Sequence, residues 1–177
     1  ADPSGVTQAL AAGARASGAR IIRRCRATNI TQQPSGEWLV ETEKGNILCE
    51  HVVNAGGTYA RQMGEWSGLQ LPMTSMTHHY FVTDTVPEFK DYDDLPVIRD
   101  DKLVSGYIRM EQKSGLIGIY EKENPNTVWV DYCPWEAENE LFEPDYDRIM
   151  PWLENALDRM PIFAELGIKR EVHGAIS

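Results

Sequence analysis

The spacing of apolar residues divides the opening of the chain into a helix and a set of strands. Val6, Leu10 and Ala14 recur at helical spacing, which predicts a helix over residues 4–17. Strand-like runs separated by turn residues follow at 19–31, 37–42 and 47–54. These runs predict a three-stranded antiparallel meander with a long first strand, and a short helix over residues 58–66 comes after it.

From about Leu71 onward the apolar residues follow the period of strands. The predicted strands cover residues 75–84, 107–110, 115–120, 128–131 and 168–177. Ile149, Leu153 and Ala156 share one face of a predicted helix over residues 145–160. The fold class is therefore α+β: a helix with a three-stranded meander, then a mostly antiparallel sheet with a C-terminal helix. The two predicted domains are residues 1–70 and 71–177.

Charge and hydropathy exclude some classes of partner. A formal net charge of −10 at pH 7 argues against a nucleic-acid partner, because phosphate binding needs clustered Lys and Arg. The one dense basic run, formed by Arg20, Arg23, Arg24 and Arg26, lies in an apparent strand, and we interpret it as a solvated face. No apolar stretch reaches the length of a membrane span, so no membrane partner is expected.

Cysteine and histidine usage does not favour a metal site. Cys25, Cys49 and Cys133 are far apart and form no CxxC pair, which is typical of free thiols in a reducing compartment. His78 and His79 are neighbours in a predicted strand, so their side chains point to opposite faces and do not easily bind one ion.

A turn of small residues, Asn54-Ala55-Gly56-Gly57, lies between a predicted strand and a predicted helix. Small residues there let another backbone, or the phosphate or ribose of a ligand, approach closely. An ordinary tight turn is the alternative. No GxGxxG sequence occurs in these residues, so the usual loop for a dinucleotide pyrophosphate is not among them.

Three side chains on the later strands have the chemistry of a binding site. A histidine such as His78, on the face that it shares with Tyr80, can carry a proton or contact a substrate near neutral pH, or it can be a hydrogen-bonded core residue. Tyr107 and Arg109 also share a face. Arg109 can hold a substrate carboxylate with two hydrogen bonds, or pair with a surface acid. Tyr107 can donate through its hydroxyl group or pack in the core.

Several segments together resemble the dimethylglycine/sarcosine dehydrogenase family of the D-amino-acid-oxidase-like FAD enzymes. The segments, in one order along essentially the whole chain, are Asp2-Pro3, residues 9–15, 52–56, 77–80, 95–100, 107–109 and 138–142. The chain departs from the family at Thr58-Tyr59, where an aromatic pair is common. It departs again at His173-Gly174-Ala175, which replaces Asn-Gly-Pro, so His173 is not expected to be catalytic.

The resemblance implies oxidation of an N-methyl amine substrate such as dimethylglycine or sarcosine, with hydride passing to FAD. It implies either oxygen or an electron-transfer flavoprotein as the electron acceptor. It also implies that the one-carbon unit is released as formaldehyde or passed to tetrahydrofolate through a domain outside this chain. It also implies the mitochondrial matrix or, in bacteria, the cytoplasm. Residues 1–70 resemble the distal part of an FAD-binding domain without its glycine-rich loop, and residues 71–177 an incomplete substrate domain. We expect an internal piece of a longer enzyme, inactive by itself.

The resemblance also implies roles for individual residues. His78 matches the active-site histidine of the family, and Tyr107 matches a catalytic tyrosine that lies beside the flavin. The cofactor-binding positions that the resemblance implies are Ala27, Ala55, Gly56, Gly57 and Tyr107. Ala27, at the end of the first predicted strand, matches the position whose backbone contacts the adenine in the family. Arg109 follows Tyr107 at the family's spacing, and its role as a carboxylate ligand is our inference.

A different class of function stays open beside the enzyme. A non-catalytic homologue, such as the regulatory subunit that acts on pyruvate dehydrogenase phosphatase, would keep the fold and bind a protein partner. The presence of His78, Tyr107 and Arg109 favours the enzyme.

Overall fold

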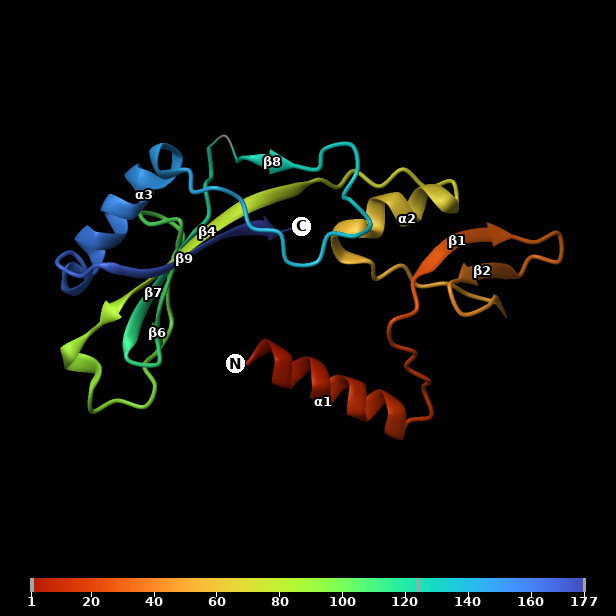
Figure 1. Cartoon of the computed structure of the whole chain (residues 1–177), viewed down its shortest axis with the longest axis horizontal. Helices are drawn as coiled ribbons and strands as arrows, with labels where there is room; N and C mark the ends of the chain where they lie inside the picture. Colours follow the sequence, from red (N-terminus) through yellow and green to blue (C-terminus); the bar gives the residue numbers. More distant parts are fainter. Residues whose placement is uncertain (1, 124, 177) are drawn as a thin grey trace. The chain divides into compact units, whose positions relative to one another are not determined.

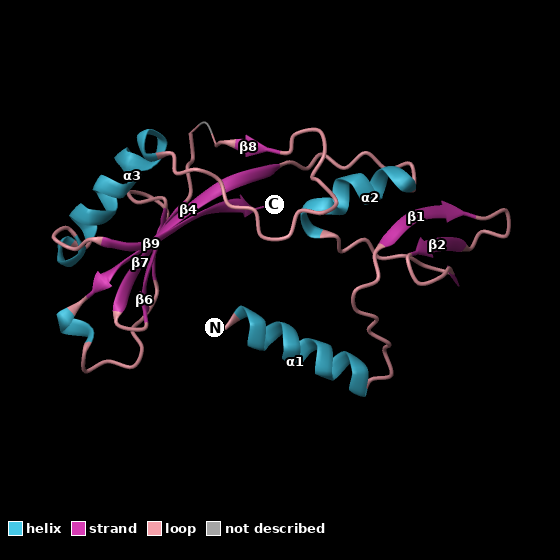
Figure 2. Cartoon of the chain, viewed as in Figure 1, coloured by secondary structure: helices cyan, strands magenta, loops and turns pink. Residues whose placement is uncertain are grey.

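The computed structural model describes residues 2–123 and 125–176. The chain forms two compact units. The first runs up to Asn54 and includes Met63–Leu69, and the second consists of Ala55–Gln62 and the residues from Gln70 onward. Figure 1 labels the elements along the chain, and Figure 2 distinguishes helices from strands. The assignment of a flavin domain to residues 1–70 and a substrate domain to residues 71–177 stays a prediction.

The first unit begins with helix α1 (Pro3–Ala16), as predicted. The Asp2 carboxylate caps it by accepting from the backbone N–H groups of Ser4 and Gly5, at 3.1 and 2.9 Å. Strands β1 (Ala27–Gln32), β2 (Trp38–Thr42) and β3 (Ile47–Cys49) then form an antiparallel sheet in the order β1-β2-β3. The predicted meander is confirmed.

The predicted lengths of the outer strands are wrong. Strand β1 starts at Ala27 instead of residue 19, so Ala27 begins the strand that it was expected to end. The cause is the central strand, which offers only five residues: Ala27 pairs with Thr42, the last of them, and Cys49 pairs with Trp38, the first. Residues beyond these pairs have no ladder partner in this sheet, so the outer strands end there.

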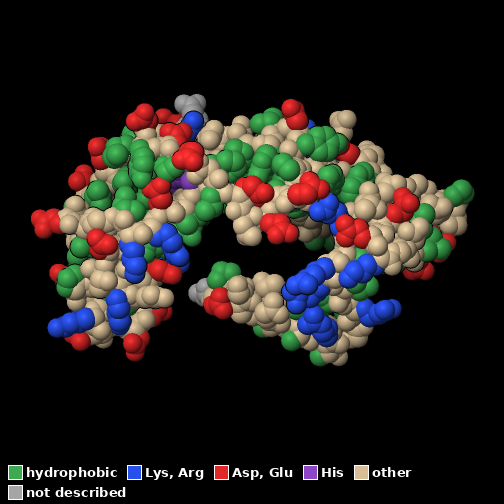
Figure 3. Space-filling model, in the orientation of Figure 1, with side chains coloured by type: hydrophobic (Ala, Val, Ile, Leu, Met, Phe, Trp, Pro, Cys, Tyr) green, Lys and Arg blue, Asp and Glu red, His purple; other side chains and the backbone are tan. Residues whose placement is uncertain are grey.

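The arginine run lies in the irregular segment before β1. All four of its members are exposed, and Arg24 has a φ of 50°. Figure 3 shows Lys and Arg side chains gathered over the end of α1 and the segment that follows it. The interpretation as a solvated face is confirmed, whereas the strand that was expected to carry it is wrong.

The second unit is built on one antiparallel sheet. Its strands are β4 (Ser75–Thr85), β5 (Ile98–Asp100), β6 (Gly106–Glu111), β7 (Ser114–Ile119), β8 (Thr127–Val128) and β9 (Ile168–Ile176). Its order is β5-β6-β7-β4-β8, with β9 also paired to β4. A 3-10 helix (Gly57–Tyr59) and helix α2 (Ala60–Trp66) lie between the two sheets in sequence. Strand β4 therefore lies at the centre, between β7 and β9.

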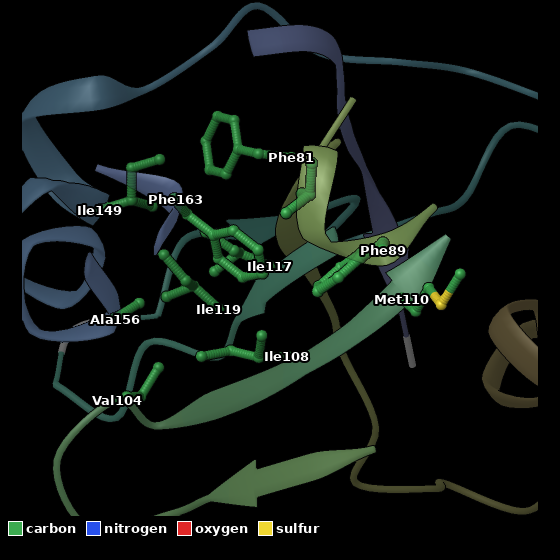
Figure 4. Packing of buried hydrophobic residues seen from close by; sticks show 11 residues of the cluster. Phe81, Phe89, Val104, Ile108, Met110, Ile117, Ile119, Ile149, Ala156 and Phe163 are labelled. Atoms are coloured by element: carbon green, nitrogen blue, oxygen red, sulfur yellow. The ribbon is translucent and has the colours of Figure 1, made fainter. Parts of the chain in front are cut away.

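Helix α3 (Tyr146–Arg159) covers one face of this sheet. Its buried residues Ile149 and Ala156 pack with Phe81 of β4 and Ile117 of β7. The whole buried cluster consists of Phe81, Val86, Phe89, Val104, Ile108, Met110, Ile117, Ile119, Ile149, Ala156 and Phe163, most of them labelled in Figure 4. In β6 the buried residues alternate with half-buried ones, so the other side chains of that strand point to the opposite face.

The α+β fold is confirmed, including the C-terminal helix and the final strand up to Ile176. Residue 177, the predicted end of that strand, lies outside the described residues. Strand β5 was not predicted, and β8 is shorter than the predicted 128–131 because Trp129 takes a φ of 50° and leaves the ladder. In the part of the chain that the structure describes, no helix is long and apolar enough to cross a membrane.

Candidate active site

A cluster of rings lies on the face of the second sheet opposite α3. The His78 ring on β4 is parallel to the Tyr107 ring on β6, with 6.0 Å between centroids and 5° between planes. Tyr120, just after β7, lies 4.4 Å from the His78 centroid and 5.8 Å from that of Tyr107. The structure thus brings together the two side chains that the sequence singled out as catalytic.

A glycine on the intervening strand makes room for the tyrosine. Gly118 of β7 is the direct partner of Tyr107 on one side and of Tyr80 on the other. A Cβ at Gly118 would overlap the Tyr107 ring, so that ring lies flat across the backbone of β7. The missing side chain at Gly118 is therefore what lets Tyr107 lie parallel to His78.

His78 is buried and its outer nitrogen is unsatisfied. The residue is only 9% exposed, and within the described residues its Nε2 atom has no hydrogen-bond partner. Burial, with smaller effects from the charges of His173 and Arg99, lowers the pKa of His78 to about 4. The imidazole is therefore neutral near pH 7, and it has a buried polar atom that a bound ligand can satisfy.

Tyr107 keeps its proton. Burial first, and then the neighbouring Tyr120, raise the pKa of the Tyr107 hydroxyl above its usual value. At neutral pH this hydroxyl is a hydrogen-bond donor as well as an acceptor.

Arg99 joins the cluster, and sequence reasoning missed it. Its Cζ atom lies 4.7 Å from the centroid of the Tyr120 ring, and the residue pairs directly with Tyr107 across β5 and β6. The available signal was the alternation of Ile98, Arg99 and Asp100 beside a strand that contains Tyr107.

Arg109 lies on β6, two residues after Tyr107. Its Nη1 atom lies 2.6 Å from a carboxylate oxygen of Glu111 and also donates to the carbonyl of Met110, at 3.1 Å. This is the surface ion pair that the sequence allowed as the alternative to a carboxylate ligand.

The predicted cofactor positions fall in both units. Ala27 belongs to the first unit, and Ala55, Gly56 and Gly57 belong to the second. Gly57 has a φ of 55°, and a Cβ placed there would meet no atom within 4 Å. This open backbone, with the unsatisfied His78 nitrogen beside the flat Tyr107 ring, fits the close approach of a dinucleotide cofactor. The individual contacts stay predictions.

A cavity of about 490 Å³ opens beside β9. Gly174, which pairs directly with His78, lines it together with Tyr59, Trp129, Glu138 and Glu140. The cavity therefore adjoins the strand next to the ring cluster.

The segment that leads to this cavity wall is tied to the start of α2. The Gln62 side chain donates to the carbonyl of Cys133, at 2.9 Å, and accepts from its N–H, at 2.6 Å. The Tyr59 hydroxyl donates to the carbonyl of Ala137. Residues directly after the small-residue turn thus hold this wall in place.

His79 points to the opposite face, as the alternation predicts. Its ring meets that of His173 edge-on, with 3.6 Å between centroids, and contacts Phe81. Both ring nitrogens of His79 lack a hydrogen-bond partner within the described residues. Burial and the charge of His173 lower the pKa of His79 to about 4 despite the opposing effect of Asp145. His173 itself is buried, with Nδ1 2.6 Å from the Glu143 carbonyl oxygen, a core position on this face.

The two lowered pKa values predict a loss of stability in mild acid. An unfolded histidine takes up a proton below about pH 6.5, whereas His78 and His79 in the fold do so only near pH 4. Their contribution to the free energy of unfolding is thus complete above pH 6.5. It falls by about 1.4 kcal/mol per pH unit for each histidine on the way to pH 4.

Thermal unfolding of the full-length protein between pH 7.5 and 5 measures this loss. We expect Tm to decline over that range, and to decline less in a His79→Gln variant, which has lost one of the two groups. An equal decline in both proteins would contradict the assignment to His79.

Neither thiols nor metal ligands form a centre here. Cys25, Cys49 and Cys133 are free. Over residues 2–123 and 125–176, no group of three His, Cys, Asp or Glu side chains is placed to hold an ion.

Comparison with known proteins identifies relatives along the whole chain. Residues 1–177 match the DAO family, described as FAD dependent oxidoreductase. Dimethylglycine dehydrogenase of Mus musculus mitochondria is 39% identical over 99% of this chain, and mitochondrial sarcosine dehydrogenase of the same species is 32% identical over 98%. These matches span 21% and 19% of the two relatives' lengths. L-proline dehydrogenase from P. horikoshii has the same fold, with a TM-score of 0.74 at 22% identity over 99% of this chain and 43% of that one.

Proposed function

The chain belongs to the FAD dependent oxidoreductase family, and we propose that it is part of an enzyme that oxidises N-methyl amines such as dimethylglycine or sarcosine. The observation that carries this proposal is the buried, unsatisfied Nε2 atom of His78 beside the parallel Tyr107 ring. The names of the two relatives supply the substrate class. Because the chain covers about a fifth of each relative, the activity is proposed for the full-length protein.

The cofactor positions follow the same proposal. The backbone of Ala27 would contact the adenine, the turn formed by Ala55, Gly56 and Gly57 would lie along the dinucleotide, and Tyr107 would lie beside the flavin. FAD, when bound, supplies the acceptor for the hydride that leaves the methyl carbon of the substrate.

His78 acts as the base that accepts the proton of the substrate ammonium group. A protonated amine has no lone pair to support loss of hydride, so its proton must leave before or during oxidation. The neutral His78 ring accepts a hydrogen bond from the ammonium group at Nε2 and takes this proton. Because burial lowers the pKa of His78 to about 4, the ring holds the proton only transiently as the hydride leaves, releases it to solvent and is neutral again for the next substrate.

Tyr107 orients the amine. Its hydroxyl stays protonated, since burial raises its pKa, and it can donate to a polar group of the substrate. The Tyr107 and His78 rings are parallel, and together they form an apolar surface that the methyl group of the substrate can contact.

Further parts of the proposal concern the surroundings of the enzyme. We propose that it acts in the mitochondrial matrix, since the names of the relatives say mitochondrial, or in the cytoplasm of a bacterial source. An electron-transfer flavoprotein would reoxidise the flavin, and tetrahydrofolate would accept the one-carbon unit through a region outside these residues. The family resemblance supports both.

Anaerobic mixing of the full-length flavoprotein with substrate tests the proposal. We expect dimethylglycine or sarcosine to bleach the flavin absorbance, and glycine, which has no methyl group to oxidise, to leave it unchanged. A flavin that stays oxidised with both methylated amines would contradict the proposal and favour the non-catalytic, protein-binding homologue.

A further inference from the structure

Arg99 and Arg109 share a sheet face with the ring cluster, and they differ in how their guanidinium groups are engaged. Arg109 uses a terminal nitrogen, Nη1, for both the Glu111 carboxylate and the Met110 carbonyl. A ligand carboxylate would have to compete with Glu111 for that edge. Arg170 lies 4.0 Å from the other oxygen of Glu111, so this acid links two arginines. Arg109 thus belongs to a small ion-pair network at the end of β6.

Arg99 is engaged through the side of its guanidinium group. The Asp101 carboxylate accepts a hydrogen bond from Nε at 2.6 Å, so the two terminal nitrogens of the guanidinium group lie outside this ion pair. The guanidinium plane is held near the face of Tyr120, with Cζ 4.7 Å from the ring centroid. Asp101 and Tyr120 together restrict the orientation of Arg99, although its side chain is 52% exposed and open to a ligand.

This guanidinium group also lies close to the predicted catalytic histidine. Tyr120 contacts both His78 and Arg99. Its ring centroid lies 4.4 Å from that of His78, and the Arg99 guanidinium group lies over its face. The charge of Arg99 is one of the effects that lower the pKa of His78. Tyr107, the direct cross-strand partner of Arg99, completes the group.

The charges within this group favour the binding of an amino acid substrate in one orientation. His78 and Tyr107 are uncharged rings at neutral pH, whereas Arg99 is a cation at the edge of the ring cluster. A substrate ammonium group is accommodated against neutral rings, and the carboxylate two bonds away from its nitrogen is drawn toward the cation.

We propose that Arg99, held over Tyr120 and anchored by Asp101, binds the carboxylate of the substrate and so makes the site selective for N-methyl amino acids over amines without a carboxylate. The inference rests on the proposed function and transfers to Arg99 the role that the sequence suggested for Arg109. A guanidinium group holds a carboxylate with two parallel hydrogen bonds, which also fixes the direction of the N-methyl group relative to His78.

Paired substrates test this assignment in the full-length flavoprotein. Dimethylglycine carries the carboxylate, and N,N-dimethylglycinamide has nearly the same shape without the charge. We expect Arg99→Gln to lower kcat/KM for dimethylglycine by about 10- to 100-fold, as for loss of a charge-assisted hydrogen bond. The value for the amide should change little, and Arg99→Lys should recover part of the loss because it keeps the charge but not the planar fork.

Arg109→Gln is the matched control, because it removes an arginine from the strand of Tyr107 on the same sheet face. It should leave the acid-to-amide ratio of kcat/KM near that of the wild type. A selective loss in this variant, with none in Arg99→Gln, would assign the carboxylate to Arg109 and overturn the proposal. An equal loss for acid and amide in Arg99→Gln would overturn it as well, because that result indicates a structural role.

A binding measurement separates this inference from the proposed function. Methoxyacetate has a carboxylate but no oxidisable amine, and its binding can be followed by the shift in flavin absorbance or by calorimetry. We expect its Kd to rise by about 10- to 100-fold in Arg99→Gln and to stay unchanged in Arg109→Gln. If wild-type flavin is not reduced by either methylated amine, the proposed function fails. A Kd that does not respond to Arg99→Gln would instead refute the role of Arg99.

Discussion

Replacing His78 with glutamine should slow reduction of the flavin by dimethylglycine or sarcosine by about 10²- to 10⁴-fold, the range for loss of a general base. Glutamine keeps a polar side chain of similar length, but it cannot take up a proton. Rapid anaerobic mixing of the full-length flavoprotein, with the absorbance of oxidised flavin as the signal, measures this step directly. It also avoids any limit set by the electron acceptor.

The neighbouring residue provides the control. His79→Gln removes an imidazole from the same strand, but from the opposite face, where it contacts Phe81 and His173 in the core. We expect this variant to have an altered Tm and a nearly normal rate of reduction. If His78→Gln reduces its flavin at the wild-type rate, His78 is not the base, whatever happens in the His79 variant.

A methyl group at Gly118 should damage both stability and catalysis. The Cβ of Gly118→Ala would occupy the space of the Tyr107 ring, so either the ring or the strand must move. Overpacking of this kind costs about 1 to 3 kcal/mol in the free energy of unfolding. Because displacement of a catalytic group by about 1 Å can cost 10²-fold in rate, we expect flavin reduction to slow by about 10- to 100-fold.

Two further variants separate the position of Tyr107 from general damage to the sheet. Gly174→Ala places a methyl group on β9, where its Cβ would lie at an ordinary 3.8 Å from Leu141 Cδ2, so this variant should change little. In the double variant Gly118→Ala with Tyr107→Ala the overlap is gone. We expect it to regain Tm without regaining the rate. A Gly118→Ala protein with normal Tm and normal rate would refute the role of this glycine.

The two predictions concern different properties of one surface. His78 supplies a neutral nitrogen that takes up a proton, and Gly118 supplies the space that holds the Tyr107 ring parallel to it. Loss of the first removes a chemical step, whereas loss of the second misplaces a partner. The split between rate and Tm in the variants therefore distinguishes the two roles.

Local patterns along the chain were enough for most of the elements and for the direction of several side chains. Strict alternation within β4 puts His78 and His79 on opposite faces, and the same rule in β6 puts Tyr107 and Arg109 on one face. The apolar spacing of α3 likewise depends on neighbours in sequence. The small-residue turn and the absence of a GxGxxG sequence could also be found from the residues alone.

Pairing between distant segments decided the rest. Strand β1 begins at Ala27 because β2 extends no further, and the three residues of β5 form a strand only because β6 lies beside them. That pairing brings Arg99 to the ring cluster, while Glu111 engages Arg109. The space over Gly118 that the Tyr107 ring occupies likewise exists only when β6 and β7 pair in this register. The sequence by itself thus determined which residues carry the chemistry and which face of a strand each occupies. Only the tertiary structure decided which of them meet, because hydrogen-bond register and ion pairing depend on residues that are far apart in the chain.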